Sequence, residues 1–193
     1  MLKEMLRLFL RNTRSKQGRS AVEELINSGE IPRSGIEIEG VISAEKVPWI
    51  AATIVVNGQQ TTSWFLVDTG ASIIIVSPTV AQVLGINFDP SNTVIVPGLL
   101  ADKFQIPCNL VSAELYFKGK GISPDTPIFV KTPVELYVPS PDSITSYCIL
   151  GRDVLNEFDY EIGFAQKKLR LDVRKEPNGA ISVVTSIPTF KQD

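Results

Sequence analysis

The sequence predicts a mostly-β fold of short strands, and three observations support this prediction. Runs of β-branched and aromatic residues alternate with clusters of Gly, Pro, Asn and Asp along most of the chain. No regular alternation of strands and helices is present, and no segment repeats at a fixed period. The chain has 193 residues, of which 44% are hydrophobic and 21% charged, which suits one globular domain with an appendage.

The first 34 residues are predicted to form a basic helical extension and a linker, and residues 35–193 to form the main domain. Apolar residues recur at helical spacing near the start of the chain, at Leu2, Met5, Leu6, Phe9 and Leu10. A second short helix is expected over Ala21–Asn27, with Ser20 as its N-cap. The stretch "SGEIPRSG", residues 28–35, is typical of a linker.

The charge of the chain is divided between this extension and the main domain. Residues 1–20 hold six of the 19 Lys and Arg residues and one of the 21 Asp and Glu residues, a net charge of +5. The other 173 residues hold 13 basic and 20 acidic residues, a net charge of −7. The extension is therefore interpreted either as a segment that packs on the domain or its partner, or as a basic amphipathic segment. In the second case, residues 1–20 make a peripheral membrane contact or target an organelle.

The same distribution bears on location and on partners. No apolar run is long enough to span a bilayer, so the protein is expected in the cytoplasm, with association to a membrane or an organelle through its N-terminal segment as the alternative. No nucleic-acid partner is expected, because the basic charge is concentrated at the front of an otherwise acidic chain.

The strands and helices of the main domain are predicted in order from turn signals. A hairpin is expected over residues 49–67, since Asn57-Gly58 favours a type I′ turn. The remaining expected elements are a short helix over residues 79–86 closed by Gly85, a hairpin over residues 92–117 with its tip near Pro97-Gly98 and Ala101-Asp102, a strand over residues 126–132, a strand over residues 146–150 that breaks at Gly151 into a helix, and two final strands within residues 160–173.

The composition excludes several kinds of chemistry. The chain has no histidine, which removes Ser-His-Asp and Cys-His catalysis and every His-ligated metal site. No metal and no cofactor are expected. Cys108 and Cys148 form no CxxC motif and are interpreted as small apolar side chains, with a disulfide as the alternative.

One carboxylate stands within an apolar context. In "FLVDTGASIIIVSP", residues 65–78, a strand leads to Asp68, a tight turn follows at Thr69-Gly70, and a second apolar run begins at once. A single carboxylate enclosed there would be costly. Two carboxylates that face each other can instead share a proton, so that one acts as a base on water and the other as an acid. The segment therefore suggests an aspartic-protease dyad.

This segment resembles the active-site segment of the retropepsin-like aspartic proteases, which has two apolar residues, Asp-Thr/Ser-Gly-Ala, apolar residues and Ser. The family has a second motif of two apolar residues, Gly, Arg or Asn, and Asp, and "CILGRDVLNEF" at residues 148–158 is similar to it. The resemblance covers residues 47–173. It implies a closed or partly closed β-barrel of the acid protease fold and an aspartic endopeptidase, a hydrolase that acts on a peptide or protein substrate.

The resemblance also implies roles for individual residues. Asp68 corresponds to the catalytic aspartate, Thr69 to the residue that braces the two active-site loops across a dimer, and Gly70 to the residue that lines the substrate cleft. Ala71 and Ser72 complete this loop, and Gly151, Arg152 and Asp153 form a structural motif beneath it. Residues 94–106 resemble the flap that covers substrate, with its contacts at Val96, Pro97, Gly98, Leu99 and Leu100.

The chain departs from the family pattern in two places. Viral members usually have an acidic residue at the position of Ser72, where it pairs with the motif arginine, so Arg152 must find another partner or make weaker hydrogen bonds. The expected flap contains one glycine in "VPGLLADKF". Since the chain has one Asp-Thr-Gly triplet, a dyad requires a second copy, and a homodimer is expected.

Three other interpretations of Asp68 and its surroundings remain. Asp68 could cap a turn with no catalytic role. The chain could be a catalytically silent retropepsin-fold module for dimerisation or binding, which the intact Asp68-Thr69-Gly70 argues against. A Ser-Lys hydrolase that uses Ser72 is the third, and no S-x-x-K spacing surrounds that serine.

Overall fold

A computed structural model describes residues 36–97, 105–120, 127–143, 146–173 and 181–189 of the chain. The predicted N-terminal extension and the predicted tip of the flap lie outside these residues. The described elements are β1 (Glu37–Ile42), β2 (Pro48–Val56), β3 (Gln59–Val67), α3 (Pro78–Val83), β4 (Val94–Pro97), β5 (Gln105–Gly119), β6 (Ile128–Pro139), β7 (Cys148–Leu150), α4 (Arg152–Leu155), β8 (Phe158–Gly163), β9 (Lys168–Val173) and β10 (Ser182–Val184).

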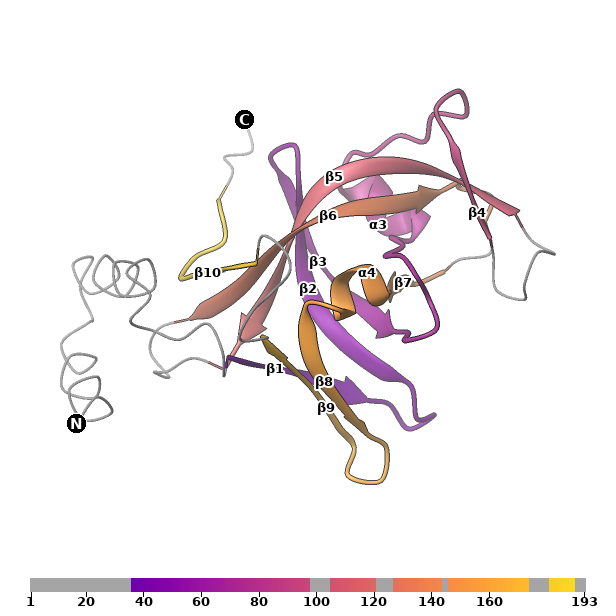
Figure 1. The fold of residues 1–193 in the computed structure, drawn as a ribbon. Coiled ribbons are helices and arrows are strands. Elements are labelled where there is room, and N and C mark those ends of the chain that lie inside the picture. The colour runs from indigo at the N-terminus through magenta and orange to yellow at the C-terminus, as the bar shows by residue number, and fades with distance from the viewer. Residues whose placement is uncertain (1–35, 98–104, 121–126, 144–145, 174–180, 190–193) are drawn as a thin grey trace.

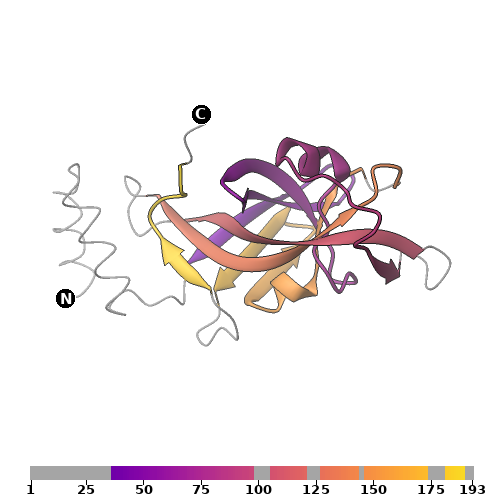
Figure 2. The same ribbon diagram turned by 90° about the horizontal axis from the view of Figure 1, so that it is seen from above.

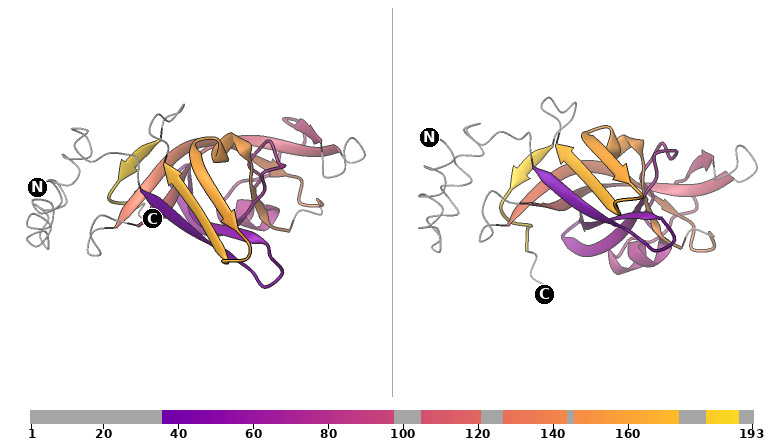
Figure 3. Two further views of the ribbon diagram at one scale, coloured as in Figure 1. Left: turned by 60° about the horizontal axis from the view of Figure 1, so that its bottom comes forward. Right: turned by 90° about the horizontal axis from the view of Figure 1, so that it is seen from below.

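The strands form one continuous sheet that folds around the core (Figure 1). Along its main path the order is β10-β6-β5-β1-β2-β3-β7, while β4 pairs with β5 and the β8–β9 hairpin joins through β9 and β1. The long β5–β6 ribbon runs along the length of the molecule (Figure 2), and the β8–β9 hairpin lies beside β1 (Figure 3). The predicted mostly-β fold is confirmed, and within the described strands the sheet does not close into a complete barrel.

The local turn signals of the sequence correspond to the observed turns. Asn57 and Gly58 have φ values of 47° and 82°, so the β2–β3 hairpin has the two left-handed residues that a type I′ turn requires. Helix α3 begins after Ser77, whose hydroxyl accepts the Val80 N–H, and Gly85 follows its end with φ of 68°. The predicted hairpin and helix are both confirmed.

Strand β6 is longer than predicted. The predicted strand ended at Thr132, just before Pro133, whereas the observed strand continues through Pro133 to Pro139. Proline cannot donate a backbone hydrogen bond and is therefore tolerated only where one edge of a strand is free. β10 pairs with residues 129–131 and stops before Pro133, so that edge carries no strand partner there among the described strands. Strands β1 and β10 were not predicted individually: residues 43–47 between β1 and β2 contain no Gly, Pro, Asn or Asp, and β10 has only three residues.

The core lies between the curved layers of the sheet and supports the ends of β3 and β7. Phe65, Phe117 and Phe158 are fully buried, and the rings of Phe117 and Phe158 meet edge to face at 5.7 Å. Leu150 and Leu155 are also buried in the same cluster. The segment that leads into α4 is therefore anchored from below by apolar packing.

Candidate active site

The two sequence motifs meet because β3 and β7 pair in parallel. The register places Leu66 opposite Ile149 and Val67 opposite Leu150. Asp68 directly follows Val67, and Gly151 directly follows Leu150, so both motifs begin at the same level of the sheet. The Asp68 N–H donates to the Leu150 carbonyl at 3.1 Å, which joins the two chain segments at this point.

Asp68 lies at the start of a tight turn. The Ala71 N–H donates to the Asp68 carbonyl at 3.2 Å, and the Gly70 N–H donates to the Asp68 Oδ1 at 2.8 Å. Asp68 is half-buried, whereas Thr69 and Gly70 are exposed. A Cβ at Gly70 would lie 3.2 Å from the Asp68 Oδ1, a tight contact that the carboxylate could relieve only by moving slightly. The carboxylate is thus held by the main chain at an accessible end of the sheet.

Gly151 allows the second motif to lie directly against the chain that follows Asp68. A Cβ on Gly151 would lie 2.3 Å from the Ile73 carbonyl oxygen and 2.7 Å from the Ile73 nitrogen. Two backbone bonds connect the same segments: the Arg152 N–H donates to the Ala71 carbonyl at 2.9 Å, and the Asp153 N–H donates to the Ser72 carbonyl at 3.2 Å. The 151–153 motif therefore packs against residues 71–73, as the resemblance implies.

The Asp153 carboxylate fixes the next part of the loop. Its Oδ2 accepts the Ile74 N–H at 2.8 Å, and its Oδ1 accepts the Val154 N–H at 2.9 Å. Burial of part of the carboxyl group raises the pKa of Asp153, and the two N–H donors act in the opposite direction. More than a third of the residue remains exposed, so water reaches one side of it. Asp153 therefore connects α4 to the strand-like segment after the Asp68 turn.

The guanidinium of Arg152 has a neutral hydrogen-bond partner. The Arg152 Nη2 donates to the Ser72 Oγ at 3.3 Å, and both residues are exposed. A hydroxyl is a weaker acceptor for a guanidinium than a carboxylate. The structure thus supplies the weaker hydrogen bond that the sequence predicts for this position.

The predicted flap is described only at its base. Strand β4 pairs with β5 from Val94 opposite Cys108 to Pro97 opposite Gln105. Val96 is buried and Pro97 is exposed. The other predicted contacts, Gly98, Leu99 and Leu100, lie outside the described residues.

Two residues with a structural part in this region, Ser77 and Asn109, were not identified from their chemistry. Ser77 caps α3, and its N–H points at the Cys148 Sγ at 3.4 Å, which ties the helix to β7. The buried Asn109 accepts the Asp89 N–H at 2.6 Å and donates to two carbonyls of residues 89–92, just before β4. The Ser-Pro pair that precedes α3 was an available signal for Ser77, whereas nothing local marks Asn109.

The structure also bears on the cysteines, on metal ligands and on membrane-spanning helices. Cys108 and Cys148 are free and buried, and burial raises the pKa of the Cys108 thiol to about 11. They pack as apolar side chains, and the alternative of a disulfide is wrong. Across the described ranges, no group of three or more Cys, Asp or Glu residues could hold a metal ion. The same ranges contain no helix with the length and apolar character needed to cross a membrane.

The open β-sheet and the two joined motifs define a retropepsin-like fold of the acid protease class. The chain belongs to the aspartyl protease family, whose sequence profile matches residues 52–154, more than half of its length. This matched range contains Asp68, the base of the flap and the 151–153 motif.

Similarity to solved structures is at the level of the fold. A crystal structure of a retropepsin-like aspartic protease from Rickettsia conorii is 21% identical with a TM-score of 0.48, and the match covers 77% of this chain and 93% of that chain. EIAV protease complexed with the inhibitor HBY-793 is 20% identical with a TM-score of 0.37, over 59% of this chain and 89% of that chain. A comparison with curated proteins returned no match.

Proposed function

We propose that this protein is an aspartic endopeptidase whose active site forms between two copies of the chain. The observation that carries the proposal is the junction of the two motifs within the family match: Asp68 at an accessible turn, held against Leu150 and supported by residues 151–153. The exposed Thr69 and Gly70 lie at the tip of this turn, where a second copy can meet it. The full chain holds one Asp-Thr-Gly triplet, so the second carboxylate must come from that copy.

The proposed reaction needs no group beyond the two carboxylates and water. Two facing Asp68 side chains share one proton, because two like charges in contact cannot both ionise. The ionised member removes a proton from water, which attacks the peptide carbonyl, while the protonated member donates to the carbonyl oxygen. The proton taken from water then passes to the amide nitrogen as the C–N bond breaks. The β4–β5 hairpin is expected to hold the peptide over the dyad.

The direct test is digestion of a peptide library by wild type and by Asp68→Asn. The substitution is close to isosteric and removes the shared proton, so cleavage should be lost while the thermal midpoint stays near that of wild type. Asp142→Asn, at an exposed turn outside both motifs, is the matched control and should cleave normally. Cleavage by Asp68→Asn at the wild-type rate would reject the mechanism. Absence of cleavage in wild type would favour a silent binding module.

The dimer is tested separately by subunit mixing. If subunits exchange and pair at random, adding an equal amount of Asp68→Asn chain to wild type leaves about half as many wild-type pairs, as expected for a self-complementary two-fold interface. Activity should fall by the same factor well above the dissociation constant, and further with excess variant. If activity stays constant while exchange is verified by mass spectrometry, one chain carries a complete site.

A further inference from the structure

An apolar patch lies on the outer face of the sheet, where β1, β2 and β3 run side by side. We call it the aromatic face, and it consists of Val41, Trp49, Trp64, Leu66 and Tyr147. Val41 pairs with Trp49, and Trp49 pairs with Leu66, so these side chains share one surface of the sheet. The ring of Tyr147 meets that of Trp49 edge to face at 5.9 Å.

Three residues of the aromatic face are largely exposed. Trp64 is 52% exposed, Val41 49% and Tyr147 42%, whereas the alternate residues Ile50 and Phe65 are fully buried on the other surface of the sheet. Contiguous apolar patches of this kind mark binding surfaces more often than single exposed residues do. Tryptophan and tyrosine supply large contact areas with little loss of side-chain entropy.

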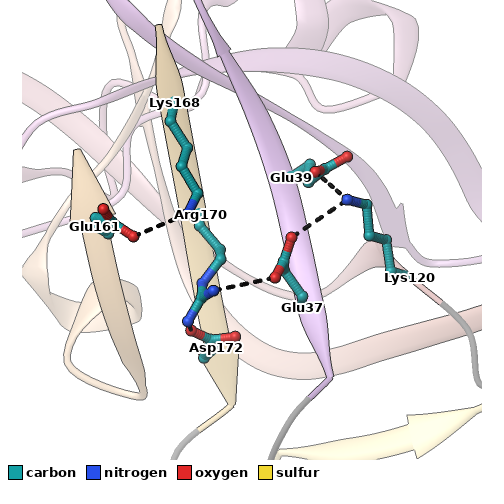
Figure 4. A network of polar contacts seen from close by, with 7 residues as sticks. All are labelled: Glu37, Glu39, Lys120, Glu161, Lys168, Arg170 and Asp172. Carbon is teal, nitrogen blue, oxygen red and sulfur yellow. Dashed lines mark hydrogen bonds and ion pairs between the residues drawn. The ribbon is translucent and has the colours of Figure 1, made fainter. Parts of the chain in front are cut away.

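Val41 of the aromatic face pairs with Lys168 on β9. Lys168 belongs to a network of charged residues that extends across β1, β9 and β8 (Figure 4). Glu37 accepts both Lys120 and Arg170 at 3.3 Å, and Lys168 pairs with Glu161 at 3.2 Å. The seven residues of this network are four acids and three bases, namely Glu37, Glu39, Glu161, Asp172, Lys120, Lys168 and Arg170. All seven charges are paired within the network, whose net charge is −1, and we call this surface the acidic edge.

The chemistry of residues 1–20 complements this surface. The segment carries a net charge of +5 against the −7 of the rest of the chain, and its apolar residues include Leu6 and Phe9. Arginine side chains stack favourably on tryptophan rings, and this chain has Arg7 and Arg11 beside those apolar residues. The pattern therefore offers both an apolar contact for the aromatic face and cations for the acidic edge.

The connection to β1 makes such a contact an intramolecular one. The described chain begins at Ile36 and enters β1 at once, and Glu37, Glu39 and Val41 lie on that strand. Residues 21–35 can span up to about 50 Å when extended, which exceeds the length of the strands that must be crossed. A tether of this length gives an effective concentration on the order of millimolar, so weak contacts suffice for docking.

We propose that residues 1–20 dock on the aromatic face of their own chain, with Leu6 and Phe9 against the tryptophans and the arginines toward the acidic edge. The proposal does not depend on catalysis. It makes the aromatic face an internal binding site for the N-terminal segment, and it makes residues 1–20 unavailable for other contacts while they are docked.

The chain contains two tryptophans, and both lie on the aromatic face, so tryptophan fluorescence, excited selectively, reports on this surface. In the full-length protein, Leu6→Glu with Phe9→Glu should shift tryptophan emission to the red and increase quenching by acrylamide. Asn12→Glu with Gln17→Glu adds the same charge at polar positions and is the matched control, which should change quenching less. In wild type, 1 M salt should move quenching toward that of the apolar-site variant, because screening weakens the basic contacts.

Circular dichroism and the thermal midpoint verify that each variant is folded. Equal quenching in wild type and in Leu6→Glu with Phe9→Glu would overturn the proposal. Two further results would overturn it in favour of another occupant. One is acrylamide quenching that decreases as protein concentration increases, both in wild type and in Leu6→Glu with Phe9→Glu, which would indicate that a second copy of the chain covers the aromatic face. The other is wild-type tryptophans that are protected only after vesicles of phosphatidylcholine and phosphatidylserine are added.

Discussion

Substitution of Asp153 by Asn tests whether the 151–153 motif holds the Asp68 loop. The Asp153 carboxylate accepts two main-chain N–H groups, from Ile74 at 2.8 Å and from Val154 at 2.9 Å. An Asn side chain has nearly the same shape, but one of its two terminal atoms is an NH₂ group. It can accept one of these N–H groups and must face the other with a donor.

The expected cost follows from that one lost bond. A hydrogen bond to a charged group contributes about 1.5–3 kcal/mol, and a buried donor without a partner costs about 1–3 kcal/mol. More than a third of Asp153 is exposed, so water can partly replace the lost acceptor, and the cost should lie near the lower limit, about 1 kcal/mol. The free energy of unfolding should fall by this amount at neutral pH, with protein concentration held constant because dimerisation would contribute.

The pH dependence gives the sharper test. Burial raises the pKa of Asp153 in the folded protein above its ordinary value of 3.8, so the folded state binds the proton more tightly than the unfolded state does. The stability from this effect is complete below pH 3.8 and is lost as the pH rises through the folded-state pKa. Asn cannot titrate. The difference in unfolding free energy between wild type and Asp153→Asn should therefore be larger at acidic pH than at pH 7.

Urea unfolding of both proteins between pH 3.5 and 7 measures this difference. A difference that grows with rising pH would show that the N–H donors outweigh burial, and would refute the assigned sign. No difference at any pH would show that the two hydrogen bonds contribute nothing measurable.

Two further substitutions probe the same loop from other sides. Gly151→Ala places a Cβ 2.3 Å from the Ile73 carbonyl oxygen and should destabilise the protein by about 1–3 kcal/mol or more. The control Gly163→Ala meets only the flexible end of the Gln166 side chain and should change stability little. Equal thermal midpoints for the two variants would contradict this prediction. Ser72→Asp gives Arg152 an acidic partner and should stabilise by about 0.2–1 kcal/mol, since both groups are exposed. This gain should vanish in high salt and in an Arg152→Gln background; a gain that persists there would come from another source.

Much of the fold could be predicted because its determinants are local. Asn57-Gly58 specifies a turn from two adjacent residues, and Gly85 ends a helix by its own backbone conformation. Strand β10 could not be predicted in this way, since its three residues become a strand only by pairing with residues 129–131, some fifty positions earlier. The length of β6 was missed for the same reason: Pro133 disfavours a strand locally, and the position is tolerable because no described strand pairs with that edge beside it.

The candidate site divides along the same line. Its chemical groups stand in two short motifs, so Asp68 and residues 151–153 could be selected from the sequence, but nothing in those motifs states how they meet. The contact depends on the parallel register of β3 and β7, which sets Val67 opposite Leu150. A shift of one residue would turn Leu150 to the other surface of the sheet and would separate the Asp68 N–H from the Leu150 carbonyl. The clash that a side chain at Gly151 would make with Ile73 disfavours such a shift, because the two segments fit closely only in this register. Gly151 is therefore the residue of the second motif that makes the junction of the two motifs sterically possible.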